Sequence, residues 1–478
     1  MYKLGIDVGG TNTDAVLIDE NLDVVSSVKQ HTTANIYDGI LNAVRAVLEQ
    51  SGVDRKEIRQ AMLGTTQCTN AIVERKNLAP IGILRIGAPA SRGIPLMVDW
   101  SEDLKTIAVG TAIVGGGFEY DGKEIAPFDT AAAGAFFREL KEKDVKSVAI
   151  SCVFSTVRND HELEAAKLCR EIMGEDVHIS ISSEIGSMGL IERENATILN
   201  AALYKVAQSF TEGFAQSLAD EGVTNAQVYL SQNDGTLMTM DYARRYPILT
   251  IACGPTNSIR GACYLSKLKN AVVIDVGGTT TDLGVIQNGF PRESGVAVTI
   301  GGVRTNFRMP DVVSIGLGGG SIVRQREDGT VTVGPDSVGY RITEKALAAI
   351  RSLCEDSIDA MKVSSQDVDV ILVGGGSIIL PADLAGAKSV TQHKFGGVAN
   401  AIGSAISKVS GTYEQLMDYD KIPRDEALAK ARAEAVELAV AAGAIRETVE
   451  IIDAEDVPLQ YYPGNTARVK IKAAGDLA

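Results

Sequence analysis

Short apolar runs separated by glycine-rich turns dominate the sequence. Apolar residues at 4–6 and 15–18 flank one Gly-Gly pair, and those at 271–274 and 283–286 flank another. Apolar runs of this length on either side of a tight turn predict two strands joined as a hairpin. Further strands are predicted at 22–29, 60–63, 147–153, 227–230, 368–373 and 449–472, and helices at 37–50, 131–143, 161–173, 188–220 (broken near 194–195), 398–410 and 424–442. This alternation of strands and helices indicates an α/β fold.

The two hairpins are copies of one segment. Residues 6–14 read Ile-Asp-Val-Gly-Gly-Thr-Asn-Thr-Asp, and residues 274–282 repeat them with Thr280 in the place of Asn12. One such hairpin alone is usually an ordinary turn, but two near-identical copies, each opening an α/β half, predict a paired phosphate-binding device. Glycine pairs let backbone N–H groups approach a phosphate closely, and threonine hydroxyls add donors. Two such turns that face each other would hold a triphosphate from both sides.

Each residue type in the repeat has an expected role. Asp7 and Asp275 end the first strand of each hairpin, where a carboxylate can hold a hydrated Mg²⁺ that also binds phosphate oxygens. The predicted phosphate-binding residues are Gly9, Gly10, Thr11, Asn12, Thr13, Gly277, Gly278, Thr279 and Thr280. Two further glycine-rich turns complete the predicted nucleotide site with Gly318, Gly319, Gly374, Gly375 and Gly376, the last three receiving adenosine. The residues expected to carry catalysis are Asp7, Asp275, Thr11 and Thr279.

The length of the chain and the position of the repeat predict the domain organisation. A chain of 478 residues exceeds what one hydrophobic core usually holds. We expect a first half at 1–250, a second half at 251–445 and a small C-terminal β appendage at 446–478. Residues 87–129 contain a glycine triplet and prolines, which indicates an inserted subdomain. The polar turn at 231–235 follows a strand, and α/β proteins often place ligands there.

Composition narrows the functional classes. The net charge of -15 disfavours nonspecific binding to nucleic acid or to an anionic membrane, but not to ATP, which local amides and a metal hold. The six cysteines form no Cys-x-x-Cys pair and the four histidines show no ligand spacing, so we predict neither a zinc cluster nor a disulfide framework. A strand pattern begins at the first residues and no segment is apolar enough to span a membrane, which predicts a cytoplasmic protein.

Taken together, these motifs resemble those of known ATPases. The two Asp-Val-Gly-Gly-Thr hairpins and the glycine triplet at 374–376 resemble the phosphate and adenosine motifs of the actin-like ATPase superfold. Residues 64–75, Gly-Thr-Thr-Gln-Cys-Thr-Asn-Ala-Ile-Val-Glu-Arg, resemble the signature of the hydantoinase/oxoprolinase family, in particular its hydantoinase A-like members. The segments 192–193, 199–201, 253–255, 315–321 and 457–463 fit the same family. This resemblance implies two actin-like ATPase (ribonuclease H-like) domains around a nucleotide cleft.

The resemblance also implies an activity. Members of the family use ATP to hydrolyse a cyclic amide, such as a hydantoin, 5-oxoproline or a related lactam, or to activate a carbonyl compound for carboxylation. The chain would then need ATP and Mg²⁺ and would act on a small cyclic amide or carbonyl substrate, alone or as the ATP-hydrolysing partner of a second hydantoinase-type subunit; homo-oligomerisation stays open. Thr65, Thr66, Thr69 and Asn70 of the signature would face the γ-phosphate or the substrate, or would instead cap the following helix.

Two departures from the family pattern affect the expected substrate. A segment of the long members is missing after residue 337, and residues 254–258 are bulkier and more polar than the tract usual there. The alternatives are therefore a small-molecule kinase or a carbonyl-activating carboxylase subunit of the same superfold. An alternative of another class is a nucleotide-switched scaffold similar to actin or the heat-shock chaperones. Cys68 lies inside the signature, where a buried small apolar role is more common for a free cysteine than a nucleophilic one.

Overall fold

The computed structural model describes residues 1–33, 35–278, 280–294, 297–307, 309–317, 321–325, 331–337, 344–459 and 464–477. These residues form two mixed β-sheets that each contain one predicted hairpin, and a third, parallel sheet in an inserted domain. The predicted positions of Thr279, Gly318 and Gly319 lie outside the described residues.

The first sheet contains the first hairpin and runs in the order β22-β23-β21-β10-β9-β4-β1-β2-β3. Its strands are β1 (Tyr2–Val8), β2 (Asn12–Ile18), β3 (Val24–His31), β4 (Ile58–Thr65), β9 (Gln227–Ser231), β10 (Leu237–Thr239), β21 (Val409–Asp418), β22 (Glu450–Pro458) and β23 (Thr466–Gly475). Strands β22 and β23 were expected as a separate appendage. They instead continue this sheet, because β23 pairs with β21 along its whole length.

The second sheet contains the second hairpin and runs in the order β13-β12-β11-β19-β20, with β16 also paired to β12. Its strands are β11 (Ala271–Val276), β12 (Thr281–Gln287), β13 (Phe290–Pro291), β16 (Val312–Ile315), β19 (Val368–Val373) and β20 (Ala387–Gln392). The core of each hairpin matches the other: β1 and β11 each pair antiparallel with the next strand and parallel with a strand from much later in the chain. The repeat in the sequence is therefore a repeat in structure.

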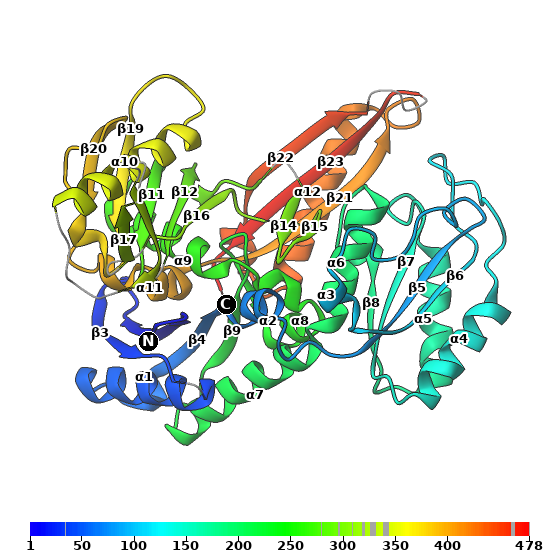
Figure 1. Cartoon of the computed structure of the whole chain (residues 1–478), viewed down its shortest axis with the longest axis horizontal. Helices are drawn as coiled ribbons and strands as arrows, with labels where there is room; N and C mark the ends of the chain where they lie inside the picture. The colour runs from blue at the N-terminus through cyan, green and yellow to red at the C-terminus, as the bar shows by residue number, and fades with distance from the viewer. Residues whose placement is uncertain are drawn as a thin grey trace.

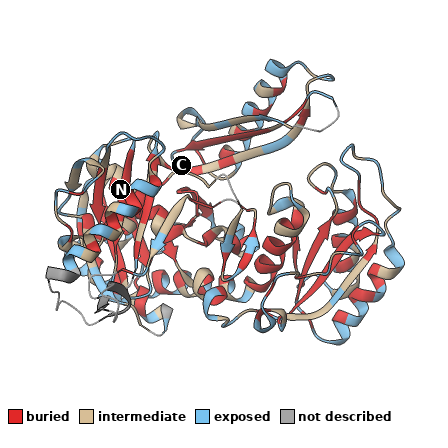
Figure 2. Cartoon of the chain, turned by 45° about the horizontal axis from the view of Figure 1, so that its top comes forward, coloured by how far each residue is buried: buried red, intermediate tan, exposed pale blue. Residues whose placement is uncertain are grey.

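Five layers build the body of the molecule (Figure 1). Helices α1 (Ile36–Ser51) and α7 (Tyr204–Asp220) cover the outer face of the first sheet, and α10 (Glu344–Met361) packs on the outer face of the second. Helices α11 (Ala399–Ile406) and α9 (Cys253–Ser266) fill the space between the sheets, α11 against the first and α9 against the second. Figure 2 shows that buried residues follow the strands of the sheets.

The two inner helices cross with their backbones in direct contact. A Cβ atom on Gly261 of α9 would lie 1.9 Å from the carbonyl oxygen of Ala399, and one on Gly403 of α11 would lie 1.8 Å from the carbonyl oxygen of Asn257. A Cβ on Gly5 of β1 would lie 2.3 Å from the carbonyl oxygen of Ala401. Only glycine fits at these three positions, so the sequence sets the distance between the two sheets.

An inserted domain lies between β4 and β9 along the chain (Figure 1). Its parallel sheet has the order β6-β5-β7-β8, built from β5 (Ile81–Ala88), β6 (Ala108–Gly115), β7 (Ser147–Cys152) and β8 (His178–Ile181). Helices α4 (Thr130–Glu142) and α5 (Asp160–Met173) pack on the sheet through the domain's own apolar core. The insertion is larger than the expected 87–129. Strands β5, β7 and β8, which lie largely outside that segment, pair in one sheet with β6, and α4 and α5 pack on that sheet.

Helix α6 (Leu190–Ala202) attaches the inserted domain to both halves. The buried Arg85 of β5 donates to Glu194 through Nε (2.7 Å) and Nη2 (2.5 Å). The neighbouring Asn195 accepts from the indole N–H of Trp100 (2.8 Å) and donates to the carbonyl oxygen of Arg304 in the second half (2.9 Å). A buried ion pair is costly to separate, because each partner would be left with an uncompensated charge. The bonds of Glu194 and Asn195 therefore hold the inserted domain in position against α6.

The remaining elements are α2 (Gln67–Glu74), α3 (Glu102–Lys105), α8 (Met240–Arg245), α12 (Arg424–Ala441), β14 (Val298–Ile300), β15 (Val303–Thr305), β17 (Ser321–Gln325) and β18 (Val331–Ser337). Of these, only α12, with slightly shifted ends, and α2, as the helix that follows the signature threonines, were expected from the sequence. The helical stretch at 188–220 breaks at Leu203, not near 194–195, because the polar residues there are buried helical anchors. Among the described residues, no helix has the length and apolarity needed to cross a membrane.

Buried charges fix the C-terminal strand β23 against both halves. Lys472 Nζ lies 2.8 Å from Asp234 Oδ2 and 2.9 Å from Glu293 Oε1. Lys470 Nζ lies 2.7 Å from the other oxygen of Glu293. Asp234 belongs to the turn at 231–235 that was expected near a ligand, and this turn is instead engaged with the C-terminal strand.

The glycine crossing gives the first testable prediction. We expect Gly261→Ala to lower the free energy of unfolding by about 1–3 kcal/mol or more, because the added methyl group meets backbone that cannot rotate away. The matched control is Gly213→Ala in α7, where the added Cβ meets only the Cβ of Tyr37 at 3.9 Å and removes a helix-destabilising glycine. Urea unfolding midpoints of the two variants measure the effect; equal midpoints would contradict the close crossing.

Candidate nucleotide-binding site

The two hairpin turns have the same backbone geometry. Asp7 pairs with Asp14 across the first hairpin, and Asp275 pairs with Asp282 across the second. The Gly9 N–H donates to the carbonyl oxygen of Asn12 (3.0 Å), and the Gly277 N–H donates to that of Thr280 (2.9 Å). Within each turn the two residues after this glycine bond, where described, are exposed, so their backbone N–H groups are accessible to a ligand.

The turns also face each other across the two halves. A Cβ added to Gly278 would lie 3.3 Å from the hydroxyl oxygen of Thr11, so the tips of the two hairpins are close neighbours. Gly10, Thr11 and Thr280 are exposed at these tips. Thr13 is placed differently: its side chain is fully buried and its hydroxyl lies 3.2 Å from that of Thr32, which itself donates to the Gly9 carbonyl (2.8 Å).

The two predicted metal-binding aspartates lie at the base of the turns, where Asp7 is buried and Asp275 is half-buried. Asp7 accepts from the side-chain amides of Asn257 (3.3 Å) and Asn400 (2.9 Å), and Asp275 accepts from the Ser258 hydroxyl (2.5 Å). Burial, followed by the nearby charge of Asp14, raises the pKa of Asp7 from its ordinary value of 3.8 to about 6. Burial raises the pKa of Asp275 as well. In both cases the surroundings disfavour the charged form of the carboxyl group.

Adjacent residues of α9 contact both aspartates. Asn257 reaches Asp7 in the first half, and Ser258 reaches Asp275 in the second. Sequence reasoning did not assign these residues or Asn400 a role. One signal pointed toward α9: residues 254–258 are more polar than the resembled family's tract, and two of these polar residues are the ones that bind the aspartates.

A glycine lies against each aspartate. A Cβ on Gly64 of β4 would lie 2.3 Å from Asp7 Oδ1, and a Cβ on Gly374 would lie 2.3 Å from Asp275 Oδ1. Gly374 follows β19 with φ of 81°, a conformation that favours glycine. The Gly376 N–H donates to the carbonyl oxygen of Val276 (2.8 Å), while Gly375 faces open space. The triplet predicted to receive adenosine is thus packed directly behind the second hairpin.

The family signature lies at the carboxyl end of β4, beside Asp7. The Thr66 hydroxyl donates to the carbonyl oxygen of Val8 (3.3 Å) and accepts from the Asn70 amide (3.4 Å). The Thr69 hydroxyl accepts from the Ala252 N–H (3.4 Å), just before α9 begins. Thr66 occupies the N-cap position of α2 but makes no side-chain capping bond. Thr65 is buried, whereas Thr66, Thr69 and Asn70 are half-buried.

Asp7 and Asp275 would supply only part of the coordination shell of a divalent cation, and phosphate oxygens and water would complete it. Among the described residues, no group of three or more His, Cys, Asp or Glu side chains has the arrangement of a metal site. The base of the turns nevertheless has spare acceptors, since Oδ1 of Asp14 and Oδ1 of Asn257 are buried without a hydrogen-bond partner. Mg²⁺ commonly takes one or two carboxylates and completes its shell with phosphate oxygens and water, which these residues fit.

Two other candidates have structural roles. Cys68 is fully buried, and burial raises the pKa of its thiol to about 12, so the reactive thiolate is disfavoured. His161 is also buried; its Nδ1 accepts from the Gly117 N–H (3.1 Å) and its ring stacks on Phe118. Neither side chain lies with the aspartates.

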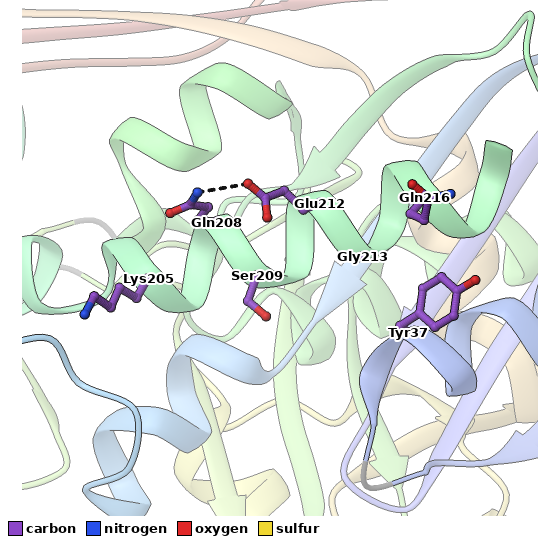
Figure 3. A pocket seen from close by; sticks show the side chains of 7 residues that line it. All are labelled: Tyr37, Lys205, Gln208, Ser209, Glu212, Gly213 and Gln216. Carbon is purple, nitrogen blue, oxygen red and sulfur yellow. Dashed lines mark hydrogen bonds between the residues drawn. The ribbon is translucent and has the colours of Figure 1, made fainter. Parts of the chain in front are cut away.

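A surface hollow lies elsewhere, on the outer side of α7 (Figure 3). Its lining residues are Tyr37, Lys205, Gln208, Ser209, Glu212, Gly213 and Gln216. Figure 3 shows Gln208 donating to Glu212 along the helix, at 2.9 Å. The outer helices separate this hollow from the hairpins, and it contains none of the predicted site residues.

Comparisons with known proteins identify the family of the chain. The chain matches the hydantoinase/oxoprolinase N-terminal region at residues 3–173 and the hydantoinase/oxoprolinase domain at residues 193–348. It is 26% identical to the caprolactamase alpha subunit of Pseudomonas jessenii, over 71% of this chain and 51% of that protein. It is 26% identical to the acetophenone carboxylase gamma subunit of Aromatoleum aromaticum, over 70% and 50% respectively, and 26% identical to the 5-oxoprolinase of Saccharomyces cerevisiae, over 70% and 29%.

The fold agrees in the same way. The crystal structure of the ATP-dependent caprolactamase from Pseudomonas jessenii superposes with a TM-score of 0.79 at 19% identity, covering 99% of this chain and 87% of that one. The α/β class and the actin-like ATPase fold are confirmed. The chain spans about half the length of the first curated relatives it matches. On its sequence and its fold, this chain belongs to the hydantoinase/oxoprolinase family.

Proposed function

We propose that this chain binds ATP between its two hairpins and uses it to phosphorylate the carbonyl oxygen of a cyclic amide. The observation that carries the proposal is the proximity of the two near-identical turns, with Thr11 of one beside Gly278 of the other. Exposed residues of both turns lie there, and their backbone N–H groups would form the kind of arrangement that binds phosphates in other proteins. Adenosine would lie behind the second hairpin against Gly374, Gly375 and Gly376.

The two aspartates support the use of a divalent cation. Asp7 and Asp275 would hold Mg²⁺, together with oxygens of the phosphates. This ion would supply positive charge that neutralises the phosphate oxygens during transfer. The residues of the chain hold the two carboxylates in place: Asn257 and Asn400 fix Asp7, and Ser258 fixes Asp275. Thr11 and Thr279 would donate hydroxyl hydrogen bonds to the transferred group.

The signature segment supports a substrate position on the first half. Thr66, Thr69 and Asn70, at the start of α2, are only half-buried, and Gly64 at the end of the preceding strand β4 lies against Asp7. Their polar groups would orient an amide or carbonyl oxygen toward the terminal phosphate. Transfer of the phosphoryl group to that oxygen makes the carbonyl carbon electrophilic. Water then adds to the carbon and the ring C–N bond breaks, with a proton passing to the nitrogen, which leaves an acyl phosphate. A second water hydrolyses this acyl phosphate and releases the free carboxylate and inorganic phosphate.

The relatives favour a second candidate substrate class. The acetophenone carboxylase gamma subunit is as similar to this chain as the caprolactamase subunit is. Both chemistries would begin with ATP-dependent activation of a carbonyl oxygen, which the same site could perform. Two of the named relatives, the caprolactamase alpha subunit and the acetophenone carboxylase gamma subunit, are enzyme subunits, and we infer that this chain also works with a second subunit.

The nucleotide proposal predicts both binding and its loss. Mg²⁺-ATP at a hundredfold excess over its dissociation constant should stabilise the chain by about 2.7 kcal/mol, raising its melting temperature. Asp7→Asn and Asp275→Asn should each lower ATP hydrolysis by about 100-fold or more. Each substitution removes a carboxylate charge that would hold Mg²⁺ against the phosphate oxygens. Asp367→Asn, an exposed aspartate outside the site, is the control. Parental hydrolysis in both site variants would refute the assignment.

The raised pKa of Asp7 predicts a pH-dependent stability. A carboxyl group with a pKa of about 6 in the folded chain and 3.8 when unfolded binds its proton more tightly when folded. Its contribution to stability therefore falls as pH rises through this window and stays low above it. Without Mg²⁺, Asp7→Asn should be more stable than the parent above about pH 6, by about 1–3 kcal/mol, with the difference vanishing below about pH 4. Thermal melts of both chains between pH 4 and about 8 measure it; a constant difference would contradict the buried charge.

The substrate proposal predicts that a cyclic amide stimulates ATP hydrolysis. We expect one of 5-oxoproline, hydantoin or caprolactam to raise ADP and free phosphate release, while the matching ring-opened amino acid does not. Ring-opened product should match phosphate if the chain is self-sufficient, or should wait for a partner subunit if it is not. A stable phosphorylated compound without free phosphate would indicate a kinase. Stimulation by ketones alone would indicate the carboxylase candidate.

A further inference from the structure

One row of residues crosses the first sheet beside the hairpin turn. Gly64, Asp7, Asp14 and Lys29 lie opposite one another on β4, β1, β2 and β3. Residues directly opposite in neighbouring strands point to the same face, so these four side chains share the face covered by α9 and α11. Their order places the two carboxylates between a glycine and an ammonium group.

The second sheet repeats this row with one difference. Asp275, Asp282 and Ser314 lie opposite one another on β11, β12 and β16, and Gly374 lies against Asp275. Ser314 therefore stands where the first half has Lys29. Its hydroxyl donates to Asp282, whereas the Lys29 ammonium lies 2.7 Å from Asp14 Oδ2. Only one of the two hairpins has a positive charge in its row.

Lys29 lies where its charge can reach a ligand. Its side chain is 37% exposed, while that of Asp14 is 2% exposed, so the ammonium lies at the boundary between the buried carboxylates and solvent. Strand β3 is tied to the first turn, because the Thr32 N–H donates to the carbonyl oxygen of Thr11 (3.0 Å). The positive charge of Lys29 also lowers the pKa of Asp275 in the other half, against the larger effect of burial. The electrostatic field of Lys29 therefore reaches both rows.

The ammonium group has donors to spare. A lysine has three N–H donors, and the bond to Asp14 uses one of them. The adenosine end of a nucleotide bound as proposed lies against residues 374–376 in the second half. The far end of its triphosphate would then approach the first half, where Lys29 is.

We propose that Lys29 contacts the terminal phosphate of bound ATP and makes the site prefer ATP over ADP. Asp14 holds the ammonium group in position through the ion pair, and the remaining N–H groups donate to phosphate oxygens. The second half binds phosphates through backbone N–H groups without such a charge. This inference rests on the proposed nucleotide site and assigns Lys29 a role within it.

The test separates this role from simple neutralisation of Asp14. We would measure the affinities of the full chain for Mg²⁺-ADP and for a non-hydrolysable Mg²⁺-ATP analogue by calorimetry. Lys29→Met should weaken analogue binding by about 10- to 100-fold, the range for a lost charged hydrogen bond, and leave ADP binding close to the parental value. Lys29→Arg should recover part of the loss. Arg45→Ala, which breaks the 2.8 Å ion pair with Glu221 between α1 and α7, is the matched control.

The double variant Lys29→Met/Asp14→Asn decides the question. It removes the carboxylate that Lys29→Met leaves without its cation, so it remains interpretable if the single variant folds poorly. A persistent loss of analogue affinity in the double variant supports phosphate contact. Parental affinity there, or equal weakening of ADP and analogue in the single variant, overturns the inference alone. Failure of the parent chain to bind either nucleotide overturns the proposed function and this inference with it.

Discussion

The close crossing of α9 and α11 sets the geometry of the whole candidate site. Because Gly261 and Gly403 carry no side chain, the two helix backbones touch and hold the two sheets at a fixed separation. This separation brings the tips of the hairpins together and lets adjacent residues of α9 reach an aspartate in each half. A larger residue at either crossing point would move the sheets apart and separate the turns.

The same crossing brings negatively charged carboxyl groups together, which is electrostatically unfavourable and consistent with the proposed binding of a cation. The carboxylates of Asp7, Asp14 and Asp275 lie near one another, and desolvation raises the pKa of each. Amide and hydroxyl donors compensate only part of this charge. A site that is unfavourable when empty gains more from a bound cation, which is the physical reason that buried acidic groups often mark functional positions.

Local sequence was enough to predict the hairpins, because a repeated motif fixes turn, register and strand together. It also predicted most helices, including α12. Sequence could not predict the extent of the inserted domain, since the strands at 81–88 and 178–181 become one sheet only through pairing between distant segments. Nor could it identify Asn257, Ser258 and Asn400, whose polar side chains look ordinary until the crossing places them beside the aspartates. The polarity of Glu194 predicted a break in the helix at this position. The structure shows no break there, because the buried ion pair with Arg85 keeps Glu194 inside α6.

The two halves share a hairpin but differ in what surrounds it, and this difference assigns them separate tasks. The second hairpin is backed by the glycine triplet, where the backbone can approach a flat ligand closely. The first is backed by Lys29 on one side and by the signature segment on the other, and that segment contacts the start of α9 through Thr69. Helix α6, which carries the inserted domain, also bonds to the second half at Arg304. A change in spacing between the halves on nucleotide binding would therefore reach the signature segment and the inserted domain together, which couples the proposed phosphate site to the proposed substrate position.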